Sequence, residues 1–183
     1  MKRLLFVILL ISGMLAAYGQ QDTSRLRWDF SAGTAFLGSG DMLALHLENA
    51  LSYKLSDYWQ GEFTLGYGKS DYGVYVTTSY VQGNLNILFA PWKLAGKHRF
   101  KIGTGFSFMN VSDTFQASDR LSNGVVDKDN YSFHVRNSYG ANIILEYVYH
   151  INERFSTGIR LFQQPYGNFD LNTGAALKVG VAL

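Results

Sequence analysis

The stretch at residues 142–162 alternates between large apolar and polar residues, in two runs separated by a short polar break. Leu145 and Leu161 stand on the apolar row, and Glu146 and Arg160 stand on the polar row. Alternation this regular indicates β-strands, because successive side chains of a strand point to opposite faces. A soluble sheet buries the apolar row, whereas a membrane barrel turns that row toward lipid and encloses the charges.

The N-terminus predicts export. Lys2 and Arg3 precede an apolar run that ends in small residues, which is typical of a secretory signal peptide over residues 1–19 and is too short for a transmembrane helix. Residues 20–183 then form the mature domain, whose formal net charge falls from +2 to zero once Lys2 and Arg3 are removed. No basic stripe indicates nucleic-acid binding, and the absence of cysteine excludes disulfides.

The mature chain has no second apolar run of helix-spanning length, so it can enter a membrane only as a closed β-barrel. Alternating segments of about ten residues or more match tilted membrane-spanning strands. The predicted fold class is all-β, an eight-stranded antiparallel transmembrane β-barrel. The predicted strands are 25–37, 42–55, 59–69, 74–90, 98–111, 132–151, 155–164 and 169–183.

The connections between these strands predict the orientation. Turns 56–58 and 152–154 are short, whereas the polar segment 110–131 on the opposite side is long. Outer-membrane barrels have short periplasmic turns and longer extracellular loops, so 110–131 is predicted to be extracellular. A three-residue turn at 152–154 also places Glu146 directly opposite Arg160.

Three features favour an inverted barrel over a soluble, lipocalin-like barrel or sandwich. The polar row carries many small residues, it carries both signs of charge, and the apolar row carries aromatics near the strand ends, as in interfacial girdles. The predicted polar network of the lumen is Asp29, Glu48, Lys54, Glu62, Lys101, Glu146, Arg160 and Lys178. The predicted interfacial aromatics are Tyr53, Trp59, Phe100, Tyr147, Tyr149 and Phe155 at the short-turn side, with Tyr67 and Tyr139 toward the loops.

The stretches "YKLSDYW" (53–59), "YHINERF" (149–155) and "FKIGTGFSF" (100–108) carry a family resemblance. The chain resembles the small eight-stranded outer-membrane barrels of the OmpA-transmembrane-domain and OmpX kind and, more loosely, short β-barrel proteins of Bacteroidetes outer membranes. The resemblance covers the whole mature chain. It implies a Gram-negative outer-membrane location, and it implies outer-membrane lipid and the barrel-assembly machinery as partners.

No residue set predicts a catalytic, cofactor-binding or metal site. Outer-membrane lipid A deacylases use a Ser, a His and a Glu, but His134, Ser138 and Glu146 would stretch along one strand over roughly 40 Å, beyond hydrogen-bonding reach. "DKDN" (127–130) lacks the later ligands of a calcium loop. The expected function is structural or surface-interacting, with a partner bound through 110–131 and a filled lumen instead of a wide pore. The alternatives are a lipid-modifying enzyme and a soluble exported ligand carrier.

Overall fold

The computed structural model describes residues 25–38, 42–71, 76–91, 97–116, 131–167 and 170–183. The predicted signal peptide, residues 1–19, lies outside these ranges. So does most of the predicted long loop, residues 117–130.

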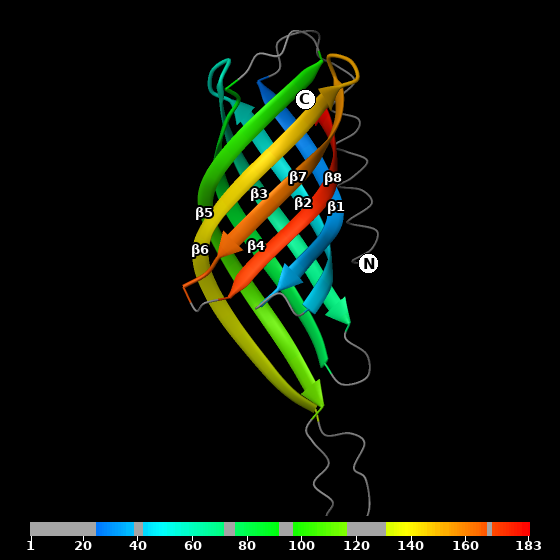
Figure 1. Ribbon diagram of the computed structural model, residues 1–183, viewed down its shortest axis with the longest axis vertical. Coiled ribbons are helices and arrows are strands. Elements are labelled where there is room, and N and C mark those ends of the chain that lie inside the picture. The colour runs from blue at the N-terminus through cyan, green and yellow to red at the C-terminus, as the bar shows by residue number, and fades with distance from the viewer. Residues whose placement is uncertain (1–24, 39–41, 72–75, 92–96, 117–130, 168–169) are drawn as a thin grey trace, which may run out of the picture.

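Eight antiparallel strands form one closed barrel in which each strand pairs with its neighbours in the sequence and β8 returns to pair with β1 (Figure 1). The strands are β1 (Leu26–Leu37), β2 (Met42–Lys54), β3 (Trp59–Asp71), β4 (Val76–Phe89), β5 (His98–Gln116), β6 (Tyr131–His150), β7 (Phe155–Pro165) and β8 (Leu171–Ala182). The predicted fold class and strand number are confirmed. No helix in the described part of the chain is long and apolar enough to cross a membrane.

The two predicted short turns, 56–58 and 152–154, have the same hydrogen bonding. In the first, the Leu55 and Ser56 N–H groups donate to the Trp59 carbonyl, and the Ser56 side chain accepts from the Trp59 N–H. In the second, Ile151 and Asn152 donate to the Phe155 carbonyl. The Asn152 side chain takes the place of Ser56 and accepts from the Phe155 N–H at 2.7 Å. A polar residue that can bond its own backbone turns both hairpins at this rim.

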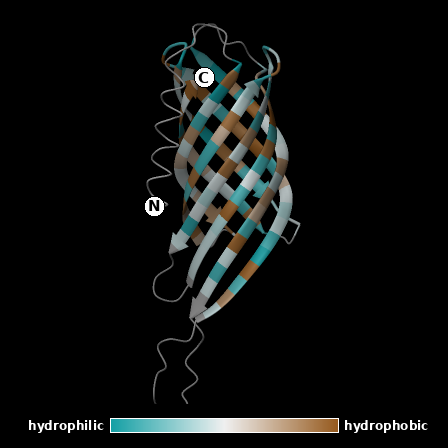
Figure 2. Cartoon of the chain, turned by 180° about the vertical axis from the view of Figure 1, so that it is seen from behind, coloured by the Kyte–Doolittle hydropathy of each residue, from teal (hydrophilic) through white to brown (hydrophobic). Residues whose placement is uncertain are grey.

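The barrel is inverted relative to a soluble barrel: its apolar row faces outward and its polar row faces the lumen. Leu145 is 48% exposed on the outer wall, whereas its neighbour Glu146 is fully buried in the lumen. Apolar and polar residues alternate along the strands in the same way around the wall (Figure 2). A soluble β-barrel would bury the leucine row, so this surface is built to contact hydrocarbon.

Glycines on the inner row make room for the large residues of the lumen. A side chain at Gly68 would overlap the ring of Tyr80, and one at Gly180 would overlap the carboxylate of Asp29. The lumen of an eight-stranded barrel is just wide enough for side chains to fill, so large inner residues need small neighbours.

Strand β5 is longer than predicted, and together with β6 it runs well beyond the other strands on the loop side (Figure 1). The pairing of β5 with β6 continues to Gln116↔Tyr131, so residues 112–116, beyond the predicted strand end at 111, form strand where a loop was predicted. The loop prediction for this part of 110–131 is therefore wrong. The outward residues Asn110, Ser112 and Thr114 are polar, so the apolar row that marks a lipid-facing strand ends before them.

Candidate functional site

The inner rows of seven strands bring seven charged side chains together in the lumen, and Arg27 joins them through Asp29 at 3.6 Å. We call this group the lumen charge cluster. Its members are Arg27, Asp29, Glu48, Glu62, Lys101, Glu146, Arg160 and Lys178. Sequence alternation places each of them on the inner face.

Arg160 lies at the centre of the cluster. It stands opposite Glu146 in the β6–β7 register, as predicted, and its Nε lies 2.9 Å from Glu146 Oε1. Its two terminal nitrogens contact Glu48 on β2 and Glu62 on β3. One guanidinium thus ties β7 to three other strands, two of them across the lumen, because its planar fork offers donors in several directions.

Two lysines complete the cluster. Lys178 Nζ lies 2.8 Å from Glu146 and 3.2 Å from Asp29. Lys101 Nζ lies 3.5 Å from Glu146 and donates to the Gln60 side-chain oxygen at 2.9 Å. Glu146 therefore contacts three cations and is the anion that most of the cluster shares.

The cluster is electrically balanced. Its four carboxylates, Asp29, Glu48, Glu62 and Glu146, face four cations, Arg27, Lys101, Arg160 and Lys178. Removing charges from water is costly unless they are paired and hydrogen-bonded, and here opposite charges meet in equal number. The lumen at this level is filled by a neutral network.

Lys54 does not belong to this cluster, so its assignment to the lumen was wrong. Its side chain is 47% exposed and pairs with Asp57 at 2.8 Å. Lys54 does stand on the inner row of β2, but it is the last residue of that strand. Alternation identifies the row of a residue and not its depth, and this position lies at the rim.

Uncharged amide side chains occupy the lumen on the loop side of the charges. Asn84 donates to Thr64 at 2.7 Å and accepts from Ser107 at 2.6 Å. Asn172 donates to Gln164 at 2.9 Å. This amide layer was not predicted. The signal was present in Gln82, Asn84 and Asn86, which repeat at every second position of one strand.

An apolar group closes the lumen above the amides. We call it the apolar cap, and it consists of Leu37, Ala44, Tyr80, Met109, Val111 and Tyr166. Tyr80 also accepts or donates a 2.8 Å hydrogen bond with His46 below it. The lumen is therefore not polar throughout, and the apolar residues on the inner row interrupt the predicted pattern.

The predicted interfacial aromatics lie on the outer wall. Tyr53, Trp59, Phe100, Phe155, Tyr67 and Tyr139 are each at least 40% exposed, and Tyr147 and Tyr149 are half-buried. Trp59 packs against Phe89 with ring centroids 4.7 Å apart, and Phe100 packs against Tyr147 at 5.0 Å. Aromatic rings at the strand ends suit the interface between lipid and water.

The residues considered for catalysis do not meet. His134, Ser138 and Glu146 occupy separate levels of β6, and Glu146 is engaged by the charge cluster. His134 is exposed, while Ser138 is buried. No three metal-ligating side chains gather within the part of the chain that the structure describes. The "DKDN" stretch lies outside the described residues.

Among the described residues, the outer segment of β6 pairs with a strand on one side alone. Pairing with β7 ends at Ile143↔Gln163, and one further bridge joins Gly140 to Tyr166. From 131 to 138, β6 pairs with β5, and no other described strand pairs with its second side. We call this second side the free edge of β6.

Backbone direction identifies the groups that the free edge presents. The Tyr139 carbonyl accepts from the Gly167 N–H on the β7 side, whereas His150 donates to Lys97 on the β5 side. Because backbone groups of a strand point alternately to its two sides, odd-numbered residues of β6 face the free edge. Phe133, Val135 and Asn137 therefore direct their N–H and C=O groups to it.

Exposed apolar side chains accompany this edge. Phe133 is 73% exposed and Val135 is 62% exposed. On the other face, Arg136 contacts Asp170 at 3.1 Å and Asp113 at 3.6 Å, which ties the segment to the β7–β8 connection and to β5. The edge is thus held in place by the barrel.

Comparison with solved structures assigns the fold. Neisserial surface protein A covers 89% of this chain and all of its own length, with a TM-score of 0.66 and 13% identity. The attachment invasion locus protein Ail of Yersinia pestis aligns with a TM-score of 0.59 and 8% identity over 87% of this chain and 99% of its own. The outer-membrane enzyme PagL aligns at 0.52 with 13% identity over 85% of this chain and 99% of its own.

At these identities the likeness is one of fold: the chain has the fold of small eight-stranded outer-membrane β-barrels. No protein-family model matches the sequence, and no curated protein matches it significantly.

Proposed function

We propose that this protein is a closed β-barrel of the outer membrane that presents the free edge of β6 to an extended segment of another protein outside the cell. The observation that carries the proposal is the outer segment of β6, which keeps β5 as a partner but has an open second side among the described residues. Exposed strand edges are templates for pairing, and proteins usually cover or charge them. Here Phe133 and Val135 stand beside the edge instead.

The filled lumen supports a role outside the barrel. The charge cluster, the amide layer and the apolar cap occupy successive levels of the interior. Eight-stranded barrels leave no water channel once their inner side chains are packed. We therefore place the function at the extended hairpin and not in the lumen, and we propose a binding role without catalysis.

The partner we propose is a peptide strand, because the edge offers backbone hydrogen bonds to any extended chain. Addition of a strand to a sheet edge gives affinity through the main chain and specificity through alternate side chains. Two structures of similar fold carry names that refer to a surface protein and to attachment, which supports such a role.

Selection from a random peptide library displayed on phage tests the proposal, with the purified barrel in detergent as bait. We expect enrichment of extended, proline-free peptides that bind the native protein. Val135→Pro removes one edge-facing N–H without touching the β5 ladder and should abolish this binding. Val135→Ala removes the side chain but keeps the N–H, so it serves as the matched control and should retain most of the binding.

Hydrogen exchange of the complex locates the contact. The amides of Phe133, Val135 and Asn137 should become protected when a selected peptide binds. Enriched peptides that bind Val135→Pro as well as the native protein would overturn the proposal. A selection that yields no enriched peptide would do the same.

A further inference from the structure

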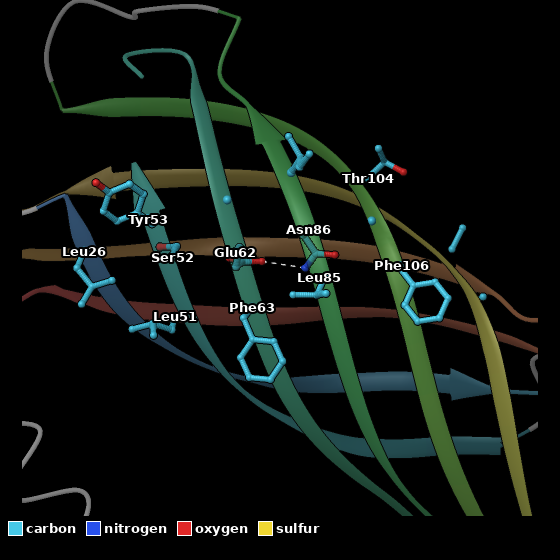
Figure 3. Close-up of a pocket in the computed structure, with 15 residues that line it drawn as sticks. Leu26, Leu51, Ser52, Tyr53, Glu62, Phe63, Leu85, Asn86, Thr104 and Phe106 are labelled. Carbon is cyan, nitrogen blue, oxygen red and sulfur yellow. Dashed lines mark hydrogen bonds between the residues drawn. The ribbon is translucent and has the colours of Figure 1, made fainter. Parts of the chain in front are cut away.

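The wall of the barrel has two chemically different faces near its short-turn end. Tyr53 and Phe63 stand exposed on the outer face, whereas Glu62 and Asn86 are buried on the inner face and share a 3.1 Å hydrogen bond (Figure 3). The outer face contacts lipid, so a water-soluble ligand reaches this end of the barrel through the opening that the inner rows surround. We call this opening the mouth.

Three basic side chains from separate strands converge on the mouth. Arg27 stands on the inner row of β1 and Arg99 on the inner row of β5, and His150 is the last residue of β6. Arg27 reaches across the opening, because its Nη1 lies 3.5 Å from His150 Nδ1. Arg99 lies close enough for its charge to act on both of these side chains.

The mouth holds more hydrogen-bond donors than acceptors. A guanidinium can only donate, so His150 accepts from Arg27 at Nδ1 and carries its own proton on Nε2. Among the described residues, neither His150 Nε2 nor Arg27 Nη2 has a hydrogen-bond partner, although both atoms are buried. A buried donor without an acceptor is costly. The described part of the chain therefore leaves two N–H groups unsatisfied beside the mouth.

The charge at the mouth is positive. The lumen charge cluster below it is neutral, and Asp29 is already shared between Arg27 and Lys178. Arg99 is exposed and has no ion pair within the described ranges. The other charged side chains of the short-turn end are mostly cationic: Arg25, Lys54, Lys97 and Arg154 against Asp57 and Glu153. An opening lined by one sign of charge concentrates ions of the opposite sign.

We propose that the mouth binds a soluble phosphate monoester, with Arg99 and Arg27 as its main contacts and His150 as the third. A tetrahedral phosphate presents acceptors in several directions, which suits donors from three strands, whereas a planar carboxylate matches one guanidinium fork. Its charge of about −1.5 to −2 at pH 7 offsets Arg99 and the cationic rim.

The ligand reaches the mouth without displacing a strand. The Arg27 side chain is 17% exposed and His150 is half-buried, so both can turn their unused N–H groups toward a phosphate held by Arg99. With the short turns in the periplasm, the ligand comes from that compartment. The mouth lies at the opposite end of the barrel from the free edge of β6, so this proposal is independent of the proposed function.

Isothermal titration calorimetry with glycerol 3-phosphate tests the site, using the barrel in dodecyl maltoside, a detergent without phosphate. We expect one site per barrel. Arg99→Gln should weaken binding about tenfold, the equivalent of one charge-assisted hydrogen bond. Lys54→Gln is the matched control, because it removes one positive charge from the same rim, but Lys54 already pairs with Asp57 at 2.8 Å. This control should bind almost as tightly as the native protein.

Two further comparisons test the chemistry of the site. Arg99→Lys keeps the charge but loses the planar fork, so it should recover part of the affinity that Arg99→Gln loses. Glycerophosphoglycerol, a diester with a single negative charge, should bind the native protein more weakly than the monoester. Heat-modifiable gel migration confirms that each variant folds, and His150→Leu, which removes the third contact, replaces Arg99→Gln if that variant fails.

Four outcomes would overturn the proposal. The first is equal affinity of the native protein and folded Arg99→Gln for glycerol 3-phosphate. The second is an equal loss in Lys54→Gln, because binding would then follow the net charge of the rim. The third is acetate binding as tight as that of the phosphate ester. The fourth is retention of phosphatidic acid by a native barrel that does not bind glycerol 3-phosphate, which would place a lipid headgroup at the rim.

Discussion

Glu146 should be the single residue on which the lumen charge cluster most depends. It contacts Lys178 at 2.8 Å, Arg160 at 2.9 Å and Lys101 at 3.5 Å, and it is fully buried. Glu146→Gln keeps the shape of the side chain but leaves the cluster with one uncompensated positive charge. Removing one partner from a buried ion pair typically costs about 3–5 kcal/mol of unfolding free energy, and we expect a loss in this range.

The structure identifies which cation this change leaves without an anion. Arg160 keeps Glu48 and Glu62, and Lys178 keeps Asp29 and Glu62. Within the described part of the chain, Lys101 keeps a direct contact to the neutral Gln60 alone. Adding Lys101→Met to Glu146→Gln should therefore restore balance and recover about 2 kcal/mol, within the usual range of coupling between contacting residues.

Arg160→Met provides the discriminating control. Combined with Glu146→Gln it also balances the formal charge, but it removes the ionic partner that Glu48 has within the described residues. We expect no recovery in that double variant. Charge balance alone would predict equal rescue by both changes, so the comparison separates contact from net charge.

Urea unfolding of the barrel in lipid vesicles, followed by tryptophan fluorescence, measures these free energies. A cost below about 1 kcal/mol for Glu146→Gln, as for a solvent-exposed ion pair, would refute the reasoning. That result would mean that water reaches the cluster and screens it.

Three other predictions concern the wall, the loop and the enzyme alternative. Leu145→Arg places a charge on the outer wall and should cost about 2–4 kcal/mol near the membrane midplane in the same unfolding assay; a neutral effect would place that wall in water. Protease added to intact cells should cut within 117–130 and spare the paired strand before it, whereas cleavage in opened cells alone would reverse the orientation. His134→Ala and Ser138→Ala should leave the lipid A acyl pattern of the host unchanged by mass spectrometry, and loss of a deacylated species would revive the enzyme interpretation.

The wall of the barrel could be predicted from sequence because its physics is local. Inside a membrane, each strand must alternate between lipid and lumen, so period two identifies the strands and their faces. A three-residue turn then fixes the partner of each residue, which is why the pairing of Glu146 with Arg160 was found in advance. Strand ends beyond the membrane gave a weaker signal, because the outward row at 110–116 changes from apolar to polar with Asn110, Ser112 and Thr114.

The contacts inside the lumen could not be predicted in the same way. Arg160 contacts Glu48 and Glu62 from strands that are distant in the barrel order. Alternation shows that three residues point inward, but the stagger of the closed sheet decides which of them share a level. Lys54 illustrates the difference, because it stands on the inner row of β2 but lies at the rim of the barrel.

The same stagger determines where a function can reside. Within the barrel every described strand has two partners, and charges, amides and apolar side chains fill the lumen between them. Above Gly140, β6 continues after β7 has ended, so the sheet acquires an open side. The predicted strands 132–151 and 155–164 already differ in length, so the overhang of β6 past β7 was contained in the sequence, although its open side was not identified. Shortening the β5–β6 overhang to the level of β7 should therefore remove peptide binding and leave the closed barrel intact.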